Sequence, residues 1–279
     1  TQGASDLLDA FEFVSITRLK HQVRQIRRGD RPDNFLQPES LSAFERTHLK
    51  DAFSVIKNLQ TALESAFGKR ATGPLRAYYD IPATHPDTLI RNIEFVALDL
   101  ETTGLDPKKD EIVSIGFVII RQLEVDFSSC EHLLVRPQKE LSESSVIVHR
   151  IFDSDVEKAP DIEIALAHIL PILAGRVLIA HHAPIELGFL GQACKRYFGA
   201  PLHIPTVDTL VLALRDLYRQ GQPIKPGALK LESQRHIHNL PPYRVHNALS
   251  DAIAASGLFL AQIAKRDPKG ELELRRVLR

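Results

Sequence analysis

The residues best suited to chemistry are two acids at the end of an apolar run. Residues 95–104 read Phe-Val-Ala-Leu-Asp-Leu-Glu-Thr-Thr-Gly, so that Asp99 and Glu101 follow a predicted strand. Side chains alternate between the two faces of a strand, and we therefore expect both acids to point the same way. Two crowded carboxylates repel each other unless a cation neutralises them, and hard oxygen ligands suit Mg²⁺ or Mn²⁺. Ordinary surface acids at a strand end are the competing interpretation.

Two further sites follow along the chain. Residues 178–190 form an apolar strand that leads into a helix whose first turn carries Glu186. The helix dipole also favours an acid there, which is a sufficient structural reason for it. In residues 246–252, His246 precedes a predicted helix and Asp251 lies about one turn inside it. Taken alone, His246 is equally a loop residue or a functional base.

The three sites together, in this order, closely resemble the DnaQ-like exonucleases of the DEDDh class, related to the ε proofreading subunit of bacterial replicative polymerase. The resemblance covers about residues 93–264, and segments 99–116 and 246–252 are highly specific for that family. It implies an α/β fold of the ribonuclease H-like type, a mixed five-stranded sheet flanked by helices. It also implies that Asp99, Glu101 and Asp251 bind metal and that His246 is the general base.

One departure from the family pattern concerns the middle site. Relatives usually have Asn and Asp where this chain has His182 and Glu186. Glu186 keeps the charge but adds a methylene, so its metal contact is either direct or through water. Asp208 is a poorer choice because it already opens another segment, residues 206–209. We therefore take Glu186 as the remaining metal-binding carboxylate.

The resemblance also indicates which residues contact substrate. The turn after the acid pair offers hydroxyls and backbone amides for a terminal nucleotide and its 3′-hydroxyl. His149 stands where relatives often have His before Gly-Ile, but Arg150 replaces the glycine here, and a structural loop histidine is equally consistent. The expected substrate-binding residues are Leu100, Thr102, Thr103, Gly104, His149 and His182.

The predicted activity is a two-metal-ion 3′–5′ exonuclease that releases nucleoside monophosphates from single-stranded 3′ ends. The expected cofactors are two Mg²⁺ or Mn²⁺ ions, and DNA, RNA and short oligonucleotides fit the sequence equally. Two alternatives remain open at this point. One is a nucleic-acid-binding module that does not cut, and the other is a regulatory or assembly module of a nucleotidyltransferase system.

These residues need a sheet to position them. β-rich runs predict strands at 95–100, 112–120, 132–135 and 177–180. Helical runs follow at about 161–173, 185–197, 209–220 and 247–265. Three strands, then helices alternating with strands, indicate a mixed sheet covered by helices, and we assign residues 91–279 to this domain.

Residues 1–68 predict a small helical domain. Apolar residues at three- and four-residue intervals between Leu49 and Phe67 form one stripe, and Ser42 and Glu45 fit a capping box. An earlier helix is expected at about 6–28. Segments 18–22, 29–34 and 41–53 resemble the C-terminal helical domain of bacterial nucleotidyltransferase-like proteins that carry CBS and cyclic-nucleotide-binding-like modules. We expect this hairpin to dock a protein partner, and residues 69–90, which contain Gly73, Pro74, Pro82 and Pro86, to be a linker.

Composition excludes several classes of protein. Hydrophobic residues make up 44% and charged residues 25% of the 279 residues, as in an ordinary globular protein, and no apolar run could span a membrane. The formal net charge is zero, although residues 195–244 carry a local basic excess that could attract phosphates. Two cysteines without metal-site spacing and a start unlike a secretory signal favour a cytoplasmic location. The absence of Met suggests either a fragment of a longer protein or a processed chain.

Overall fold

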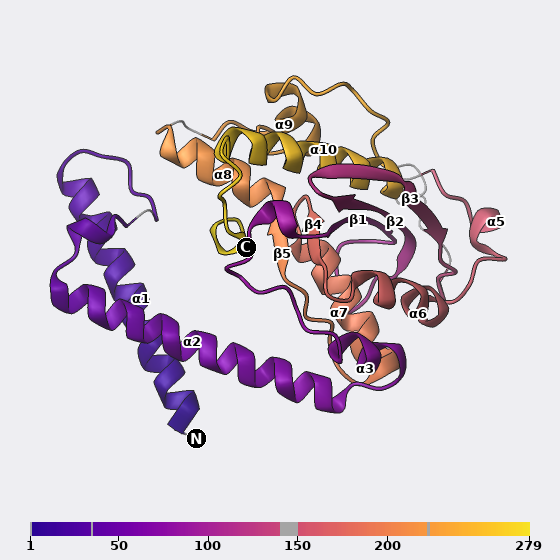
Figure 1. Ribbon diagram of the computed structural model, residues 1–279, viewed down its shortest axis with the longest axis horizontal. Coiled ribbons are helices and arrows are strands. Elements are labelled where there is room, and N and C mark those ends of the chain that lie inside the picture. Colours follow the sequence, from indigo (N-terminus) through magenta and orange to yellow (C-terminus); the bar gives the residue numbers. More distant parts are fainter. Residues whose placement is uncertain (1, 35, 140–149, 222–223) are drawn as a thin grey trace. The chain divides into compact units, whose positions relative to one another are not determined.

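The computed structural model describes residues 2–34, 36–139, 150–221 and 224–279. The chain divides into two compact units, Thr1–Phe67 and Gly68–Arg279. Both are drawn in Figure 1, and each is described by itself below. Across the described residues, none of the helices combines the length and the apolar character needed to cross a bilayer.

The first unit is built on two long helices, α1 (Gln2–Arg27) and α2 (Ala43–Arg70), with a short 3-10 helix, η1 (Pro38–Ser40), between them. The capping box at the start of α2 is confirmed. The Glu45 backbone N–H donates to Ser42 Oγ at 3.1 Å, and the Ser42 N–H donates to a Glu45 carboxylate oxygen at 3.0 Å. This reciprocal pair satisfies two backbone donors at the helix start and fixes where α2 begins.

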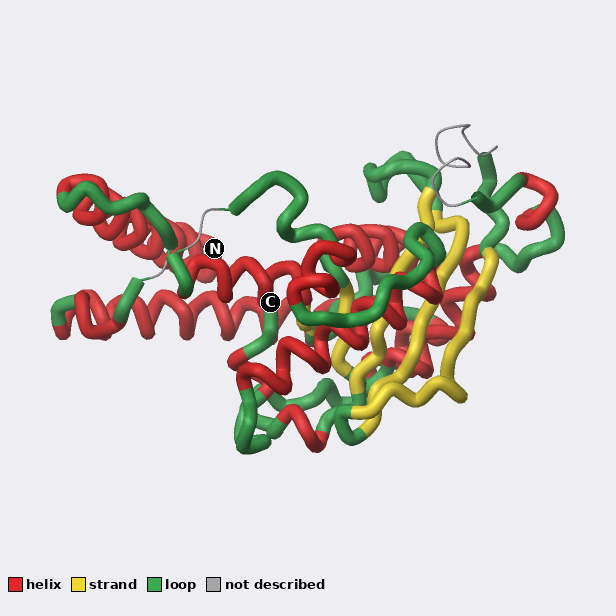
Figure 2. Tube along the Cα trace, turned by 90° about the horizontal axis from the view of Figure 1, so that it is seen from above, coloured by secondary structure: helices red, strands yellow, loops and turns green. Residues whose placement is uncertain are grey.

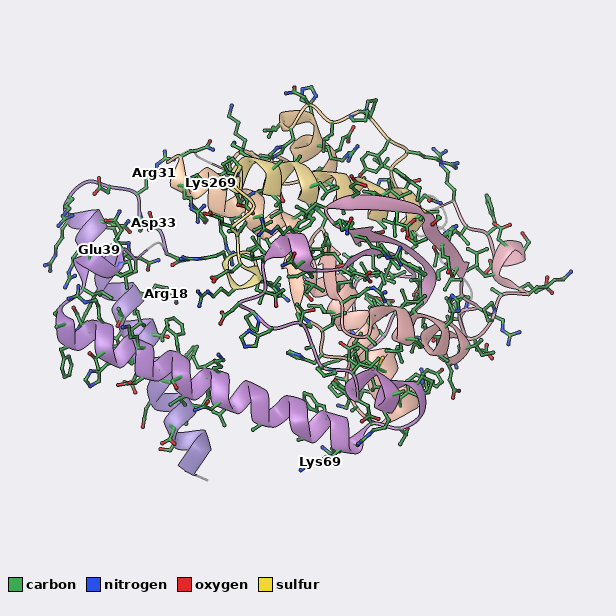
Figure 3. The ribbon with its side chains drawn as sticks, in the orientation of Figure 1. Arg18, Arg31, Asp33, Glu39, Lys69 and Lys269 are labelled. Atoms are coloured by element: carbon green, nitrogen blue, oxygen red, sulfur yellow. The ribbon has the colours of Figure 1, made fainter. Side chains whose placement is uncertain are left out.

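The connection between α1 and α2 folds back onto the end of α1. The His21 ring lies 3.2 Å from an Asp33 carboxylate oxygen, and the Asp33 N–H donates to the Gln25 side chain at 2.9 Å. Figure 3 labels Asp33 and Arg31 in this connection, together with Arg18 on α1. Side-chain hydrogen bonds therefore hold this part of the connection against the end of α1.

The second unit contains a five-stranded mixed sheet, as the sequence predicted. Its strands lie side by side in the order β3-β2-β1-β4-β5 (Figure 2). The outer antiparallel part pairs β1 with β2 and β2 with β3, whereas β4 and β5 run parallel to β1. The strands are β1 (Phe95–Thr102), β2 (Ile112–Arg121), β3 (Glu124–Leu134), β4 (Val177–Ala180) and β5 (Thr206–Asp208).

Helices cover the sheet on both sides. α10 packs along β1, β2, β3 and β4, and Figure 1 shows α6 and α7 on the opposite side of the sheet. The Phe95 and Phe259 rings meet at 4.9 Å in the core between β1 and α10. The remaining helices are α3 (Gly73–Tyr79), η2 (Ile90–Asn92), α5 (Asp153–Val156), α6 (Ile162–Leu173), α7 (Pro184–Phe198), α8 (Thr209–Arg219), α9 (Leu231–Ile237), α10 (Ala248–Arg266) and η3 (Leu274–Arg276).

Residues 69–90, which we expected to be a linker, hold helix α3 and pack into the second unit. Leu75 is fully buried, and the Tyr78 hydroxyl donates to the His203 carbonyl at 2.8 Å. Tyr79 likewise donates to the Pro201 carbonyl at 2.7 Å. Pro74 occupies the first turn of α3, where the backbone N–H that proline lacks would have no partner within the helix. At this position proline favours the start of a helix, whereas the sequence suggested a break.

Strand β3 begins at Glu124, eight residues earlier than the predicted start at His132. It is an edge strand in which polar residues interrupt the apolar ones and no residue is fully buried, so the sequence contains no sustained apolar run there. Strand β5 is only three residues long and was not predicted either. Both elements owe their conformation to pairing with a neighbour rather than to local pattern.

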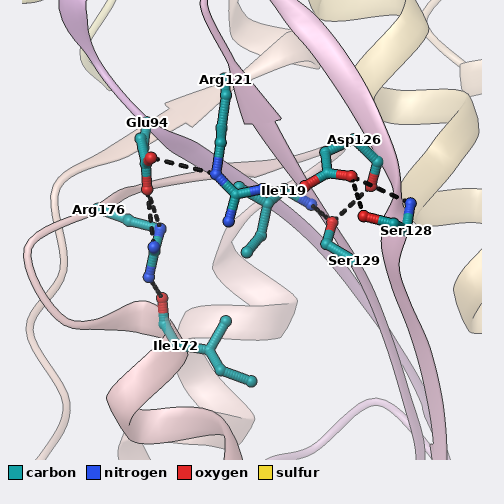
Figure 4. Close-up of polar contacts among 8 residues, drawn as sticks. All are labelled: Glu94, Ile119, Arg121, Asp126, Ser128, Ser129, Ile172 and Arg176. Atoms are coloured by element: carbon teal, nitrogen blue, oxygen red, sulfur yellow. Dashed lines mark hydrogen bonds and ion pairs between the residues drawn. The ribbon is translucent and has the colours of Figure 1, made fainter.

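An ion-pair cluster fastens the end of the sheet where β1 begins (Figure 4). Glu94 accepts hydrogen bonds from Arg121 at the end of β2, at 3.2 Å, and from Arg176 just before β4, at 2.9 Å. Arg121 also pairs with Asp126 of β3. Four strands are thus held in register at one end, and the opposite end, where β1 and β4 finish, carries the acids.

Candidate active site

Strand β1 presents Asp99 and Glu101 on the face that α10 covers. The side chains at 95, 97, 99 and 101 share one face because strand side chains alternate. Phe95 and Ala97 belong to the core that also contains Phe259 of α10. The apolar part of this face is therefore sealed by α10, and its last two positions are carboxylates.

Gly116 lets α10 approach these acids. It lies opposite Asp99 in the pairing of β1 with β2. A Cβ atom at Gly116 would lie 2.1 Å from the carbonyl carbon of Ala248 and 2.1 Å from the Leu249 nitrogen. The first turn of α10 thus rests directly on the backbone of β2, beside Asp99.

This contact brings Asp251 into the same place. Asn247 caps α10 through its side-chain oxygen, which accepts from the Ser250 N–H at 3.1 Å, and the Asn247 N–H donates to Asp251 Oδ2 at 3.0 Å. One carboxylate oxygen from each of Asp99, Glu101 and Asp251 lies within 4.8 Å of the others. Among the described residues, these three acids form a group that could hold a metal ion.

Glu186 lies in the first turn of α7, which follows β4. Its residue is only 3% exposed, and its Oε2 atom has no hydrogen-bond partner among the described residues. Glu186 is not a member of the 4.8 Å group, but its charge is one cause of the raised pKa of Asp99. A buried carboxylate oxygen without a donor needs a cation or a proton nearby.

Asp208 positions Glu186 by holding the junction between β4 and α7. Its carboxylate accepts from the His182 N–H at 3.1 Å and from the Ala183 N–H at 3.0 Å. It also caps α8 by accepting from the Leu210 N–H at 3.0 Å. His182 lies in the left-handed region at φ 76°, a conformation that costs energy for histidine and that these hydrogen bonds hold in place.

Burial, and for three of them a neighbouring negative charge, raises the pKa of each of the four acids. Burial and the charges of Glu186, Asp251 and Glu101 raise the pKa of Asp99 well above its usual range. Burial, followed by the charge of Asp251, raises the pKa of Glu101 to about 7. Burial raises the pKa of Glu186 to about 8, with a further contribution from Asp208. Burial also raises the pKa of Asp251.

This donor set fits a divalent metal. A cation among the acids would offset the cost of ionising four crowded carboxylates and give Glu186 Oε2 a partner. All of the donors are carboxylate oxygens, which suit Mg²⁺ or Mn²⁺ rather than a thiophilic metal. The residues that would hold the metal are Asp99, Glu101, Glu186 and Asp251.

The turn after β1 is rigid. The Thr102 hydroxyl donates to the Gly104 carbonyl at 2.7 Å, and Thr103 Oγ1 accepts from the Glu111 N–H at 3.0 Å. A Cβ atom at Gly104 would lie 2.4 Å from an Asp110 carboxylate oxygen, so a larger residue there would displace the Asp110 side chain. Leu100 is buried and faces the side opposite the acids. Of the expected substrate-binding residues, the turn residues and His182 lie at the acid end of the sheet, whereas Leu100 would offer only its backbone there.

Of the two histidines expected from the sequence to act at the site, His246 lies next to the acids. His246 is exposed, directly before the N-terminal cap of α10, and its φ is 60°. Its charge lowers the pKa of Asp251. It is therefore close to the acid group and accessible to a ligand. His149 lies outside the described residues.

Comparison with known proteins agrees with this arrangement. Residues 96–259, more than half of the chain, match the model of the Exonuclease family, RNase_T. The chain belongs to the RNase_T exonuclease family. Residues 1–67 match a second model, described as "Putative nucleotidyltransferase substrate binding domain". Both family resemblances seen in the sequence are thereby confirmed.

Several curated relatives of this chain carry DNA polymerase III in their names. DNA polymerase III PolC-type of Thermotoga petrophila is 34% identical over 174 residues, covering 62% of this chain and 12% of the relative. The DNA polymerase III subunit epsilon-like protein of Rhodobacter capsulatus is 30% identical over 185 residues, covering 66% of this chain and 26% of the relative. The chain thus spans a minor part of the length of each.

Solved structures share the fold. E. coli Exonuclease I in complex with a dT13 oligonucleotide has a TM-score of 0.54 at 16% identity, over 63% of this chain and 42% of that one. Cell-death related nuclease 4 has a TM-score of 0.50 at 13% identity, over 62% and 64%. At these identities the likeness shows the ribonuclease H-like fold alone. Together with the family match, it makes the second unit an RNase_T nuclease domain.

Tyr243 is a site residue of the RNase_T domain that the sequence analysis missed. Its hydroxyl donates to Asp251 Oδ1 at 2.9 Å, and burial and the Asp251 charge raise its own pKa. Arg235 lies over the Tyr243 ring, 5.0 Å from the centroid, and is itself fixed to the Pro241 and Ala254 carbonyls. Tyr243 thus orients Asp251. A tyrosine eight residues before an acid has no periodic signature that could have revealed this.

The RNase_T domain also has a separate cleft of about 400 Å³, between the loop after β1 and α7. Its lining includes Lys108, Lys109, Arg136, Lys139 and Arg196 and none of the four acids. Arg136 pairs with Asp161 at 2.8 Å and Lys109 with Asp106 at 3.3 Å, so that part of this charge is neutralised internally. We assign the cleft no part in the chemistry at the acids.

We expect Mn²⁺ to raise the melting temperature more at about pH 8 than at about pH 5. Without metal, the folded chain holds protons on Glu101 and Glu186 that the unfolded chain releases, because their pKa values rise to about 7 and about 8. Stability of the metal-free chain therefore falls as pH rises from the ordinary carboxyl pKa through these values. Metal binds the ionised carboxylates and displaces their protons, so its stabilisation grows over the same range.

The measurement is thermal unfolding with chelator and with Mn²⁺ at matched ionic strength. Asp251→Asn serves as the control, and its Mn²⁺ response should be small at both pH values. An equal response of the wild-type and control chains would mean that the ion binds elsewhere.

Proposed function

We propose that this RNase_T domain is a two-metal-ion 3′–5′ exonuclease that releases nucleoside monophosphates from single-stranded 3′ ends. One observation carries the proposal. Asp99, Glu101 and Asp251 gather within 4.8 Å, and beside them Glu186 is buried with a carboxylate oxygen that lacks a partner. Ionising crowded carboxylates costs electrostatic free energy, and a divalent metal offsets that cost. The acids lie at the end of the sheet where β1 and β4 finish.

Relatives support a nucleic-acid substrate. Exonuclease I, which shares the fold, has been solved with a dT13 oligonucleotide, and the curated relatives are named as forms or subunits of DNA polymerase III. By analogy, the substrate is a single strand with a free 3′ end, and a polymerase is a candidate partner. The resemblance to the DEDDh class supplies the direction of cleavage.

The metals, when bound, would activate a water and stabilise the leaving oxygen of the scissile phosphodiester. Asp99, Glu101, Glu186 and Asp251 would hold them. Tyr243 and Asn247 fix the orientation of Asp251 through hydrogen bonds to its two oxygens. Asp208 fixes the junction that carries Glu186. These supporting contacts keep the acids in place before substrate arrives, which lowers the reorganisation that catalysis requires.

His246 accepts the proton of the attacking water. It is exposed, so solvent can take that proton onward, and it lies directly before the cap of α10, which carries Asp251. The Thr102 and Thr103 turn is held by its own hydrogen bonds, so its remaining donors and acceptors have fixed positions for a terminal nucleotide.

The test is digestion of single-stranded DNA and RNA oligonucleotides labelled at either end. With Mg²⁺ or Mn²⁺, a 5′-label should produce a ladder that shortens from the 3′ end, while a 3′-label should appear at once as a mononucleotide. Chelation should stop both reactions. Binding without cleavage in the presence of metal would instead indicate a module that holds nucleic acid and does not cut.

We expect His246→Ala to lower the rate by about 10²–10⁴-fold, the usual share of general acid–base catalysis. Metal binding should persist, because His246 is not among the acids that hold the metal. The assay is the single-turnover rate against pH, with the Mn²⁺ thermal shift measured in parallel.

His85→Ala is the matched control. Its side chain is 74% exposed, and it lies in the segment before β1, ten residues ahead of the start of that strand. If both variants lose the same activity, or neither does, His246 is not the base.

A further inference from the structure

Arg235 is a buried cation on α9, the helix that precedes α10 in the chain. The residue is only 8% exposed, and its Nε atom has no hydrogen-bond partner among the described residues. Within the same part of the chain, no carboxylate forms an ion pair with it. Burying a charged group without an opposite charge costs free energy, so the contacts that Arg235 does make must offset that cost.

The guanidinium group of Arg235 joins α9 to α10 and to the loop between them. One terminal nitrogen donates to the Ala254 carbonyl of α10 at 2.8 Å, and the other donates to the Pro241 carbonyl of the loop at 2.8 Å. The guanidinium carbon also lies 5.0 Å from the centre of the Tyr243 ring, within the range of a cation–π contact. Gly257 leaves room for it on α10, because a Cβ atom there would lie 3.1 Å from Arg235 Nη1. The planar fork of arginine makes all of these contacts at once, which the single ammonium of lysine cannot do.

The loop that Arg235 holds carries two residues of the acid site. Tyr243 donates to one of the metal-binding acids at 2.9 Å, and His246 follows it in the same loop, directly before the α10 cap Asn247. His246 has a φ of 60°, in the left-handed region, so this conformation persists only if the chain on both sides is held. On one side, hydrogen bonds at the start of α10 fix Asn247. On the other side, Arg235 holds both Pro241 and Tyr243.

We propose that Arg235 is a positioning residue that sets the place of His246 and Asp251 together. It anchors the loop at Pro241 and Tyr243, so that the base and the metal-binding acid keep one geometry before substrate arrives. The inference rests on the proposed nuclease, in which Asp251 holds metal and His246 takes the proton of the attacking water. Partners that orient a metal ligand contribute about 10–100-fold to metal affinity or activity, and a displacement of about 1 Å costs about 10²-fold in rate.

The first experiment compares Arg235→Met and Arg235→Lys with the wild-type chain, at a temperature where circular dichroism shows each to be folded. Met cannot donate to either carbonyl, so kcat should fall about 10²-fold, whereas KM should change much less because the turn after β1 is held by its own hydrogen bonds. Arg235→Lys keeps the charge but not the fork, and its kcat should still fall about 10-fold. Mn²⁺ affinity, measured from thermal unfolding without nucleic acid, should fall about 10-fold in the Met variant. If the Met variant does not fold, the Lys variant decides the question.

A second arginine of α10 offers a matched control. Arg266 also donates to two backbone carbonyls, those of Gln262 at 2.9 Å and Leu212 at 2.8 Å, but it is the last residue of α10. Arg266→Met should lower the free energy of unfolding and leave kcat and Mn²⁺ affinity unchanged. Coupling then separates positioning from stability. Arg235→Lys should cost less in kcat when His246 is already Ala than in the wild-type chain, because no base is left to misplace.

Three results would overturn the role of Arg235 alone. They are an unchanged kcat and Mn²⁺ affinity in its folded variants, the same losses in the Arg266 control, and an equal cost of Arg235→Lys with and without His246. A wild-type chain that neither cleaves nor binds Mn²⁺ would instead overturn the proposed nuclease, and the role of Arg235 with it. The wild-type measurements therefore show which of the two proposals has failed.

Discussion

Replacing Glu186 with Gln is expected to abolish cleavage while stabilising the metal-free chain at about pH 8. The substitution keeps the shape of the side chain but removes the charge that would hold metal. Metal-assisted stabilisation of the transition state is worth several kcal/mol, which corresponds to a loss on the order of 10³-fold or more. Glu186→Ala should lose activity to the same extent.

The gain in stability follows from the raised pKa. Burial raises the pKa of Glu186 to about 8, so that between its ordinary value and about pH 8 the folded metal-free chain is penalised for ionising it. The wild-type stability therefore falls as pH rises through that range, and the Gln variant should lack this part of the slope. The measurement is chemical unfolding in chelator at about pH 5 and about pH 8.

Glu186→Asp is the matched control, because it restores the acid that relatives usually have at this position. It should keep measurable activity and a Mn²⁺ thermal shift. An active Gln variant would remove Glu186 from the site, and the remaining three acids would then have to hold the metal alone.

Replacing Gly116 with Ala should damage both folding and catalysis. The added Cβ would lie 2.1 Å from backbone atoms of Ala248 and Leu249, and a backbone cannot rotate out of the way. Overpacking of this kind costs about 1–3 kcal/mol, and the first turn of α10 would have to move away from β2. Since that turn carries Asp251, a displacement of about 1 Å would lower the rate by about 10²-fold.

Gly191→Ala, in the middle of α7, is the control for this substitution. A Cβ atom added at Gly191 would have its nearest neighbours 4.0 Å away, an ordinary van der Waals contact. Alanine also has a higher helix propensity than glycine. It should be neutral or slightly stabilising. Equal behaviour of the two alanine variants, measured by urea unfolding and by the cleavage rate, would contradict the close approach of α10 to β2.

Local sequence patterns predict much of this site. Acids two residues apart at the end of an apolar strand must share a face, because strand geometry leaves no other choice, and Asp99 and Glu101 do. The order of the acids and His246 was enough to indicate the family that comparison then showed. The capping box at Ser42 and Glu45 is equally local, and it formed as its spacing required.

Only the tertiary structure decided how the distant parts meet. Asp251 reaches Asp99 because Gly116 has no side chain to hold α10 away. The junction that carries Glu186 is held by Asp208, an acid that the sequence suggested only as the opening of another segment. Tyr243 and the edge strand β3 take their roles from neighbours far along the chain, where local periodicity carries no signal. The reason is physical. A strand or a helix cap is fixed by interactions within a few residues, whereas burial, close approach and a shared charge depend on surfaces that exist only after the chain has folded.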